Sequence, residues 1–386
     1  MKIVIAPDSF KGSLSAAAVA EAMERGVKRC FPQAETIKVP IADGGEGTMD
    51  SLIMATGGQA IKVQVTGPLG SIVDAAYGLL QSESGHVAVI EMAQASGITL
   101  IASNERSPLT ATTYGTGELI KRALDDGCRS FILALGGSAT NDGGAGMLQA
   151  LGMHLLDETG KEVGWGGGQL KHIQTIDDRD WDSRIAESQF LIASDVQSPL
   201  LGPEGATFVY GPQKGVTPDM LETLEKYMTA WADLIEQTNG IKLHELAGAG
   251  AAGGLCGAFL AFFPTTMRRG IDVVIEYTGI DEHLTDADLV ITGEGQIDAQ
   301  TVNGKTPMGV AQEAQKFNVP TIALAGSVGE GIDKLYEHGI NAVFSIMNSP
   351  MSLQHAMDHA AELISSTTEQ VMRTFYLQQR RKGGIS

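Results

Sequence analysis

One pattern recurs along this chain: a short apolar run is followed by a loop rich in glycine and acidic residues, and then by residues with helical spacing. The pattern is typical of α/β folds, because parallel strands are buried on both faces and read as continuous apolar runs. Residues 3–6 form the first such run, and the loop 7–12 follows it. A helix is predicted from about Ser15, with Ser15 or Ser13 as its N-cap.

A second unit of this kind lies near the N-terminus, and three more lie in the last third of the chain. Their apolar runs are residues 37–42, 289–292, 321–325 and 342–346. Loops that follow parallel strands gather at the carboxyl edge of their sheet. We therefore expect both ends of the chain to share one doubly wound parallel sheet.

The middle of the chain has a different pattern. Residues 73–80 and 86–92 are predicted to form an antiparallel strand pair, and further strands are expected at 131–135 and 190–193. We expect a second, inserted α/β domain, with the candidate site in the cleft between the two domains. The predicted division is residues 1–85 and 285–386 for the discontinuous first domain and residues 86–284 for the inserted domain.

The charge balance limits the partners of this protein. Its 386 residues include 27 Lys and Arg against 46 Asp and Glu, a formal net charge of −19. Nucleic acids and anionic lipid surfaces would be repelled, so we expect neither as a partner. Three cysteines are too few and too far apart for a disulfide framework, and the apolar start of the chain is too short for a signal peptide. The longest apolar stretch, 255–263, is too short to cross a membrane, so we expect a cytoplasmic protein.

The strongest candidate for a binding site is the loop 136–146. It lies between a predicted strand and a predicted helix, and five of its residues are glycines. Its backbone N–H groups could hold an anion at the start of the helix. A tight connection alone rarely needs a loop of this length. The residues that carry this prediction are Gly136, Gly137, Ser138, Thr140, Asn141, Asp142, Gly143 and Gly144.

Acidic residues follow most of the predicted strands. They are Asp8, Asp43, Glu46, Asp142, Asp195, Glu294 and Asp298. Carboxylates at such an edge can hold Mg²⁺ or accept a proton from a substrate hydroxyl, although each one alone could equally be a helix cap or a solvated loop residue. Lys11, Lys214 and Lys305 could supply cations for an anionic ligand, or could be surface lysines.

Two familiar nucleotide-binding motifs are incomplete in this chain. Gly304, Lys305 and Thr306 match the end of a P-loop, but Ala299 stands at the position of its first glycine. Gly293 and Gly295 begin a dinucleotide fingerprint, but Asp298 occupies the third glycine position. No Gly-x-Ser-x-Gly nucleophile motif is present, so covalent acyl chemistry is not indicated.

Seven segments resemble the signature segments of the type I bacterial glycerate kinases, in the same order and from end to end of the chain. They are APDSFKGSLSA (6–16), ADGGEGT (42–48), ALGGSATNDGGAGM (134–147), SDVQSPLLGPEGA (194–206), YGPQKG (210–215), GAGAAGGL (248–255) and DLVITGEGQIDAQTVNGKTP (288–307). Gln197 and Tyr210 depart from the family pattern, where we expect Asn and Phe in many members. Neither departure removes a charge or a glycine.

The resemblance implies a flavodoxin-like domain built from both chain ends and an inserted domain similar to restriction-enzyme folds. It also implies an ATP-dependent kinase that uses Mg²⁺ and phosphorylates D-glycerate, at the 2-hydroxyl rather than the 3-hydroxyl. From the residues alone, phosphorylation at the 3-hydroxyl and a two-lobed small-anion-binding protein stay open as alternatives, and so does a homodimer. A dehydrogenase is disfavoured by the incomplete dinucleotide fingerprint.

With this activity, roles can be assigned to the candidate residues as a hypothesis. Phosphoryl transfer requires cations near the phosphates and an acceptor for the hydroxyl proton. Asp8 or Asp195 would accept the proton, and Lys11 would meet the carboxylate of glycerate. The expected catalytic residues are Asp8, Lys11 and Asp195, and the expected glycerate ligands are Ser9, Asp43, Gly44, Gly45, Glu46 and Thr48. The expected nucleotide ligands are Gly136, Gly137, Ser138, Asn141, Gly143, Gly144, Glu294, Gln296 and Lys305, and the expected Mg²⁺ ligands are Asp142, Asp195 and Asp298.

Overall fold

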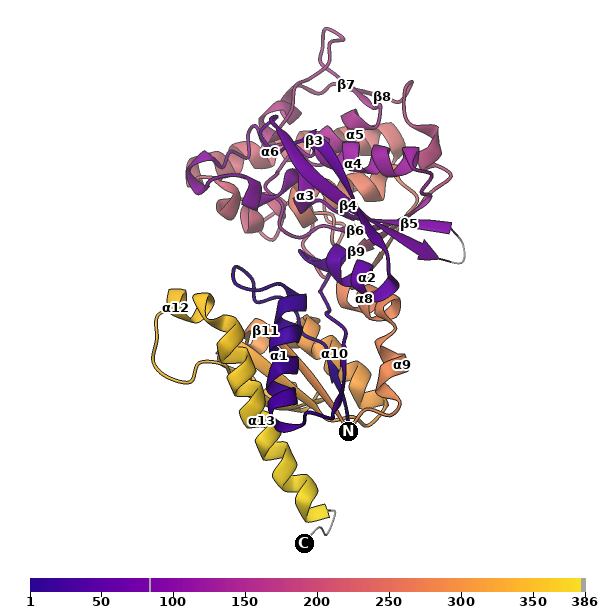
Figure 1. Ribbon diagram of the computed structural model, residues 1–386. Coiled ribbons are helices and arrows are strands. Elements are labelled where there is room, and N and C mark those ends of the chain that lie inside the picture. Colours follow the sequence, from indigo (N-terminus) through magenta and orange to yellow (C-terminus); the bar gives the residue numbers. More distant parts are fainter. Residues whose placement is uncertain (83–84, 383–386) are drawn as a thin grey trace. The chain divides into compact units, whose positions relative to one another are not determined.

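The computed structural model describes residues 1–82 and 85–382 and divides into two compact units (Figure 1). The first unit comprises Met1–Asp43, Asp50–Ala55 and Ile271–Ser386, and the second comprises Gly44–Met49 and Thr56–Gly270. Both units contain a sheet with parallel strands flanked by helices. The mixed α/β class expected from the sequence is confirmed.

The first unit is built on a five-stranded, fully parallel sheet with the order β13-β12-β11-β1-β2. Its strands are β1 (Lys2–Ile5), β2 (Glu35–Lys38), β11 (Leu289–Ile297), β12 (Thr321–Val328) and β13 (Ile340–Ser345). Numbered within the unit, the order is 2-1-3-4-5, the flavodoxin-like arrangement. The strand order reverses between β1 and β11, which is the position where ligands bind in open α/β sheets.

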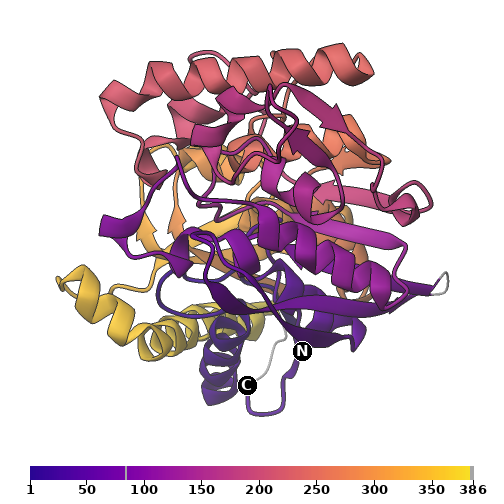
Figure 2. The same cartoon turned by 90° about the horizontal axis from the view of Figure 1, so that it is seen from above.

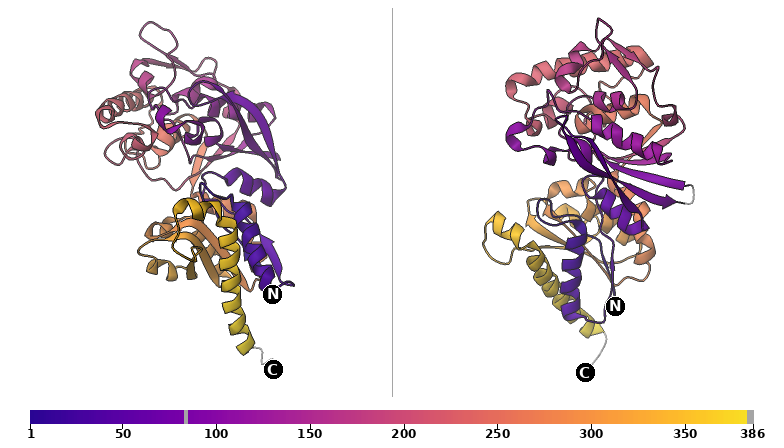
Figure 3. Two further views of the ribbon diagram at one scale, coloured as in Figure 1. Left: turned by 60° about the vertical axis from the view of Figure 1, so that its left-hand side comes forward. Right: turned by 45° about the horizontal axis from the view of Figure 1, so that its top comes forward.

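Helices flank this sheet (Figure 1). The helices are α1 (Ala16–Cys30), α10 (Thr306–Lys316), α11 (Asp333–Tyr336), α12 (Leu353–Asp358), α13 (Ala360–Lys382) and α9 (Ile280–Leu284), with the short 3₁₀ segment η8 (Ala299–Asn303). The side chain of Ser15 accepts a hydrogen bond from the backbone N–H of Ala18, so the predicted start of α1 is confirmed. Helix α13 lies along α1 (Figure 3), and a Cβ atom at Gly26 would come within 2.5 Å of the carbonyl oxygen of Ser365.

The second unit contains a six-stranded sheet with the order β10-β9-β6-β5-β4-β3. Its strands are β3 (Gln59–Thr66), β4 (Ile72–Ser82), β5 (Gly85–Glu91), β6 (Ser130–Ala134), β9 (Gln189–Ala193) and β10 (Thr265–Arg268). The strands from β10 to β5 are parallel, whereas β4 pairs antiparallel with both β5 and β3. The predicted antiparallel pair is thus confirmed. β7 (His154–Leu156) and β8 (Thr175–Asp177) form a separate two-stranded antiparallel sheet.

The helices of the second unit are mostly short. They are α3 (Ala93–Ser96), α4 (Tyr114–Asp125), α5 (Ala145–Ala150), α7 (Leu255–Phe262) and the long α6 (Pro218–Asn239), which runs along one side of the unit in Figure 2. Short 3₁₀ segments are η1 (Ile98–Leu100), η2 (Ser103–Glu105), η3 (Gly167–His172), η4 (Ser183–Ile185), η6 (Pro212–Lys214) and η7 (Ala251–Gly254), and η5 (Ala206–Tyr210) is a short π-helix. Phe131 and Phe190 stack at the centre of the core, with ring centroids 4.5 Å apart. Helices α2 (Thr48–Thr56) and α8 (Gly270–Thr278) contain boundaries between the units, and a further boundary lies between Asp43 and Gly44 in the loop before α2.

Two features differ from the sequence-based expectation. The second unit contains Gly44–Met49 and Thr56–Gly270, rather than residues 86–284, because β3 and β4 continue its sheet through β5. Strand β11 continues through Gly293–Ile297, where a loop was expected. This stretch stays extended because it pairs in register with residues 324–328 of β12.

Among the helices of residues 1–82 and 85–382, none combines the length and the apolar character that a membrane span requires.

Candidate functional site

The first candidate region lies at the switch point of the five-stranded sheet, where β1 and β11 end. Asp8 follows β1, and its backbone N–H donates to the carbonyl oxygen of Gly293 at 2.8 Å. Glu294 is the next residue of β11. The two strands therefore bring two acidic side chains to one edge of the sheet, although 286 positions of sequence separate them.

Asp8 is only 3% exposed, and both of its carboxylate oxygens accept hydrogen bonds. The hydroxyl of Thr306 donates to Oδ2 at 2.8 Å, and the backbone N–H of Ser9 donates to Oδ1 at 2.6 Å. Burial raises the pKa of Asp8 to about 6, and the charge of Asp43 adds to this increase. The hydrogen bond from Thr306 and the charge of Lys11 act in the opposite direction. A carboxylate of this pKa can exchange a proton near neutral pH.

Glu294 is similarly buried, with 8% of its surface exposed. It accepts a hydrogen bond from the hydroxyl of Thr301 at 2.9 Å and lies 3.4 Å from the ammonium group of Lys305. Burial raises the pKa of Glu294 to about 7, and the charge of Asp8 adds to this effect, whereas Lys305 lowers it. The charge of Asp8 therefore influences the ionisation of Glu294, and such interacting pairs of carboxylates are common in catalytic sites.

The expected ligands at the end of β11 are partly engaged in local structure. Asp298 is the N-cap of η8, and its carboxylate accepts from the backbone N–H of Gln300 at 2.8 Å and from the side chain of Gln296 at 2.8 Å. The hydrogen bond from Gln300 holds the pKa of Asp298 below its usual value. Thr301 completes this cap: its hydroxyl accepts from the backbone N–H of Asp298 and donates to Glu294.

The second candidate region is the glycine-rich loop 136–146, which joins β6 to α5. Asp142 is fully buried at its centre. Its carboxylate accepts from the backbone N–H and the hydroxyl of Thr113, both at 2.8 Å, and from the backbone N–H groups of Gly144 and Gly146. Burial raises the pKa of Asp142, and these hydrogen bonds oppose the increase. In this structure Asp142 holds the loop in shape, and its oxygens are occupied by protein donors.

Lys214 lies beneath the same loop and is 1% exposed. Its ammonium group donates to the carbonyl oxygen of Thr140 at 2.8 Å. Burial lowers the pKa of Lys214 to about 7, and the nearby charge of Asp142 opposes this change. Lys214 therefore supports the backbone of the loop and is not a surface lysine.

A second glycine-rich segment packs on this loop. The backbone N–H of Gly143 donates to the carbonyl oxygen of Gly253 at 3.0 Å, and the indole N–H of Trp231 donates to the carbonyl oxygen of Gly143 at 3.0 Å. A Cβ atom at Gly253 would lie 2.0 Å from the carbonyl oxygen of Thr140. Sequence reasoning gave no role to Thr113, Trp231 or Gly253, and the resemblance of 248–255 to a family segment was the only signal for this packing.

The loop after β2 divides between the units at Asp43 and Gly44. Within the first unit, Asp43 faces Asp8 closely enough to raise its pKa. Within the second unit, a Cβ atom at Gly44 would lie 2.6 Å from the carbonyl oxygen of Ala193, and one at Gly136 would lie 2.8 Å from Cα of Gly45. Residues 44–48, the start of the 136–146 loop and the end of β9 are therefore neighbours. Asp195, two positions beyond β9, is half-buried there.

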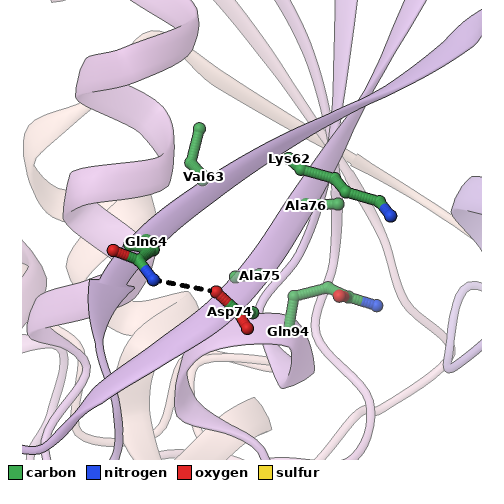
Figure 4. A pocket seen from close by; sticks show the side chains of 7 residues that line it. All are labelled: Lys62, Val63, Gln64, Asp74, Ala75, Ala76 and Gln94. Atoms are coloured by element: carbon green, nitrogen blue, oxygen red, sulfur yellow. Dashed lines mark hydrogen bonds between the residues drawn. The ribbon is translucent and has the colours of Figure 1, made fainter.

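The described residues contain no cluster of metal-ligating side chains, and a pocket at β3 and β4 lies outside the predicted site. Within residues 1–82 and 85–382, no group of three or more His, Cys, Asp or Glu side chains is close enough to hold a metal ion. A cavity of about 500 Å³ at the paired strands β3 and β4 is lined by Lys62, Gln64, Asp74 and Gln94, among others (Figure 4). The side chain of Gln64 donates at 3.1 Å to Asp74, its partner on the neighbouring strand (Figure 4). None of its lining residues belongs to the predicted site.

Comparison with known proteins agrees with the resemblance. The model of the "Glycerate kinase family" matches residues 3–376. The chain is 51% identical over 377 residues to a glycerate kinase of Bacillus subtilis (strain 168), covering 98% of both chains. It is 44% identical to the glycerate 2-kinase of Escherichia coli (strain K12), covering 99% of this chain and 100% of that protein. The crystal structure of a glycerate kinase 2 from Salmonella typhimurium LT2 superposes with a TM-score of 0.85 at 47% identity, covering 98% of this chain and 99% of that chain. This chain belongs to the glycerate kinase family.

Proposed function

We propose that this protein transfers the γ-phosphoryl group of Mg-ATP to the 2-hydroxyl of D-glycerate and forms ADP and 2-phospho-D-glycerate. The observation that carries the proposal is the pair of buried carboxylates, Asp8 and Glu294, whose pKa values of about 6 and about 7 lie near neutrality at the switch point of the sheet. Similarity to a protein named glycerate 2-kinase in E. coli supports the 2-hydroxyl as the acceptor.

In this proposal Asp8 is the proton acceptor. Phosphoryl transfer depends mainly on positioning and charge neutralisation, together with a group that accepts the hydroxyl proton. The hydroxyl oxygen bonds to the γ-phosphorus, the bond to the β-phosphate oxygen breaks, and the proton passes to the carboxylate of Asp8. With a pKa of about 6, Asp8 is mostly ionised at neutral pH and still basic enough to take up a proton. Asp195 is the alternative acceptor.

The substrate carboxylate and the phosphates need cations or N–H donors. We assign the glycerate carboxylate to Lys11, whose charge already acts on Asp8, and to the loop 43–48 with Ser9. We assign the phosphates to the N–H groups of the loop 136–146, with Lys305 and Gln296 from the first unit. Glu294 belongs to the nucleotide site as the ion-pair partner that positions Lys305. Asp142 and Lys214 hold this loop in shape, and they act on the ligand only indirectly, through the backbone of the loop.

Mg²⁺ fits the oxygen donors of this chain, because the ion commonly uses one or two carboxylates and completes its shell with phosphates and water. Asp142 is fully buried and accepts four hydrogen bonds from the protein, which leaves it unsuited as a ligand, whereas Asp195 and Asp298 are only half-buried. We therefore assign Mg²⁺ to Asp195 and Asp298. The ion would neutralise charge on the β- and γ-phosphates.

The test is to incubate the protein with ATP, MgCl₂ and a panel of small hydroxy acids, following ADP release and locating the phosphorylated carbon by NMR. We expect ADP formation that requires both D-glycerate and Mg²⁺, with phosphate on the 2-oxygen. Absence of glycerate-dependent ADP formation would contradict the proposed activity, whereas 3-phosphoglycerate would contradict only the assigned position.

A further inference from the structure

The second unit contains a pocket of about 220 Å³ that the proposed phosphate loop borders without filling. Gly136, Gly137 and Ser138 form one wall, and Ala251 and Ala252 of η7 form another. The volume is below the roughly 300–1,000 Å³ of pockets that enclose a drug-sized ligand. It therefore suits one part of a ligand rather than a whole nucleotide.

The lining of this pocket is neutral. Apolar side chains of Ile98, Leu135 and Val196 line it, and its polar side chains are Ser138, Tyr210 and Gln213. None of the lining residues, all in the described part of the chain, carries a charge. Glycerate and triphosphate are anions that would lose their hydration here without gaining a cation. An apolar pocket with a few amides and hydroxyls instead fits a flat, uncharged heterocycle.

The walls are held in place before any ligand arrives. The backbone N–H of Ile98 donates to the carbonyl oxygen of Gly137 at 2.8 Å, and the hydroxyls of Tyr210 and Ser198 lie 3.2 Å apart. Ala252 has a φ of 54°, a conformation that residues other than glycine rarely adopt. Such local strain persists where surrounding structure enforces it and is common at ligand sites. A rigid slot of this kind loses little entropy on binding.

We propose that this pocket binds the adenine base of ATP. The inference rests on the proposed function and identifies the part of the substrate that the second unit recognises. The same backbone that forms the pocket wall at Gly136–Ser138 belongs to the loop 136–146, to whose N–H groups the phosphates are assigned. The base and the phosphates would then bind to neighbouring parts of one loop.

The test fills the pocket and compares a ligand that has the base with one that lacks it. Val196→Phe places a large neutral side chain in the pocket from a half-buried position. Val209→Phe is the matched control, because Val209 is 46% exposed and does not line the pocket. Binding of ADP and of pyrophosphate to each protein is measured by calorimetry, and the KM values for ATP and glycerate are measured in the kinase assay.

We expect Val196→Phe to weaken ADP binding and raise the KM for ATP about tenfold or more, with pyrophosphate binding and the glycerate KM changed less than about twofold. Val209→Phe should match the wild type in every measurement. Unchanged ADP binding in Val196→Phe, an equal loss of pyrophosphate binding, or a rise confined to the glycerate KM would overturn the proposal. A further outcome separates the two proposals. If Val196→Phe weakens ADP binding but the wild type forms no ADP from ATP and glycerate, the proposed function is contradicted and the base pocket is supported.

Discussion

The hydroxyl of Thr306 donates a hydrogen bond of 2.8 Å to the carboxylate of Asp8, across 298 positions of sequence. Thr306 is the first residue of α10, and Asp8 follows the first strand of the chain. Because both side chains are buried, the bond holds the orientation of the Asp8 carboxylate and favours its ionised form. A residue with no chemistry of its own thus lowers the pKa of the proposed base, which burial and the charge of Asp43 raise.

Replacing Thr306 with Val should raise the pKa of Asp8 further, because a hydrogen bond that lowers it is lost. If ionised Asp8 is required, the acid limb of the kcat profile should move up by about 0.5–1 pH unit. The pH dependence of kcat measures this directly. Thr368→Val is the matched control, because Thr368 is also buried but donates within α13 to the carbonyl of Ile364. An acid limb that stays in place would remove Asp8 from the role of base.

Glu294 should make the first unit less stable as the pH rises. The folded-state pKa of Glu294 is raised from its usual 4.5 to about 7, so the folded protein holds this proton more tightly than the unfolded chain between these values. The contribution of Glu294 to the free energy of unfolding is therefore present at low pH and is lost as the pH rises from about 4.5 to about 7.

Comparison of wild type and Glu294→Gln by urea unfolding at several pH values should show this loss. Relative to the variant, the free energy of unfolding of the wild type should fall by on the order of 2 kcal/mol between pH 4.5 and pH 7. Glu337→Gln, at an exposed position, should track the wild type. Parallel curves for wild type and Glu294→Gln would be inconsistent with the raised pKa.

Lys11→Ala should raise the KM for glycerate about tenfold, because a charge-assisted contact with the substrate carboxylate would be lost. Removal of Lys11 also raises the pKa of Asp8, so the kinetics should be measured at pH 8, above the acid limb. Lys334→Ala, at an exposed lysine of α11, is the control. An unchanged KM for glycerate would exclude Lys11 from the substrate site.

Lys214→Met should destabilise the second unit by about 1–3 kcal/mol, because the buried carbonyl of Thr140 loses its donor. The same change at Lys226, an exposed residue of α6, should alter the free energy of unfolding by less than about 0.5 kcal/mol. Chemical unfolding measures both. Equal midpoints for the two variants would mean that Lys214 does not support the loop.

Gly253→Ala should lower the free energy of unfolding more than Gly240→Ala does, although both glycines have positive φ angles, of 69° and 77° respectively. A Cβ at Gly240 meets nothing within 4 Å, so that change measures backbone strain alone, about 1 kcal/mol. At Gly253 the added Cβ would lie 2.0 Å from the carbonyl oxygen of Thr140 and must displace the loop. We expect an additional loss of about 2 kcal/mol and a higher KM for ATP. Similar losses in both variants would show that the two loops can separate freely.

The sequence contained enough information for the sheet of the first unit, because its buried parallel strands are continuous apolar runs such as Ile3–Ile5 and Leu289–Ile291. Strand β3 was missed although its signal was present: Ile61, Val63 and Val65 alternate with Ala60, Lys62 and Gln64. The extension of β11 could not be foreseen, because glycines and Glu294 are poor strand formers and only the pairing with β12 keeps them extended.

For the site, sequence position identified the acidic residues but not their environments. Asp142 and Asp298 both follow strands, yet one carboxylate is saturated by Thr113 and two glycine N–H groups and the other caps η8. The partner hydroxyls of Asp8 and Glu294 belong to Thr306 and Thr301, which nothing distinguishes from other threonines along the chain. Burial of Lys214 is likewise a property of the folded unit alone.

Strand β1 lies between β2 and β11, and β11 begins only at Leu289. During synthesis the N-terminal strands therefore emerge early but lack a neighbour on one side until most of the chain has left the ribosome. The residues of the second unit, from Thr56 to Gly270, are all available before that partner appears. Because domains generally fold as units as they emerge, the inserted unit should mature first, while Lys2–Ile5 remains exposed to chaperones and to wrong strand partners.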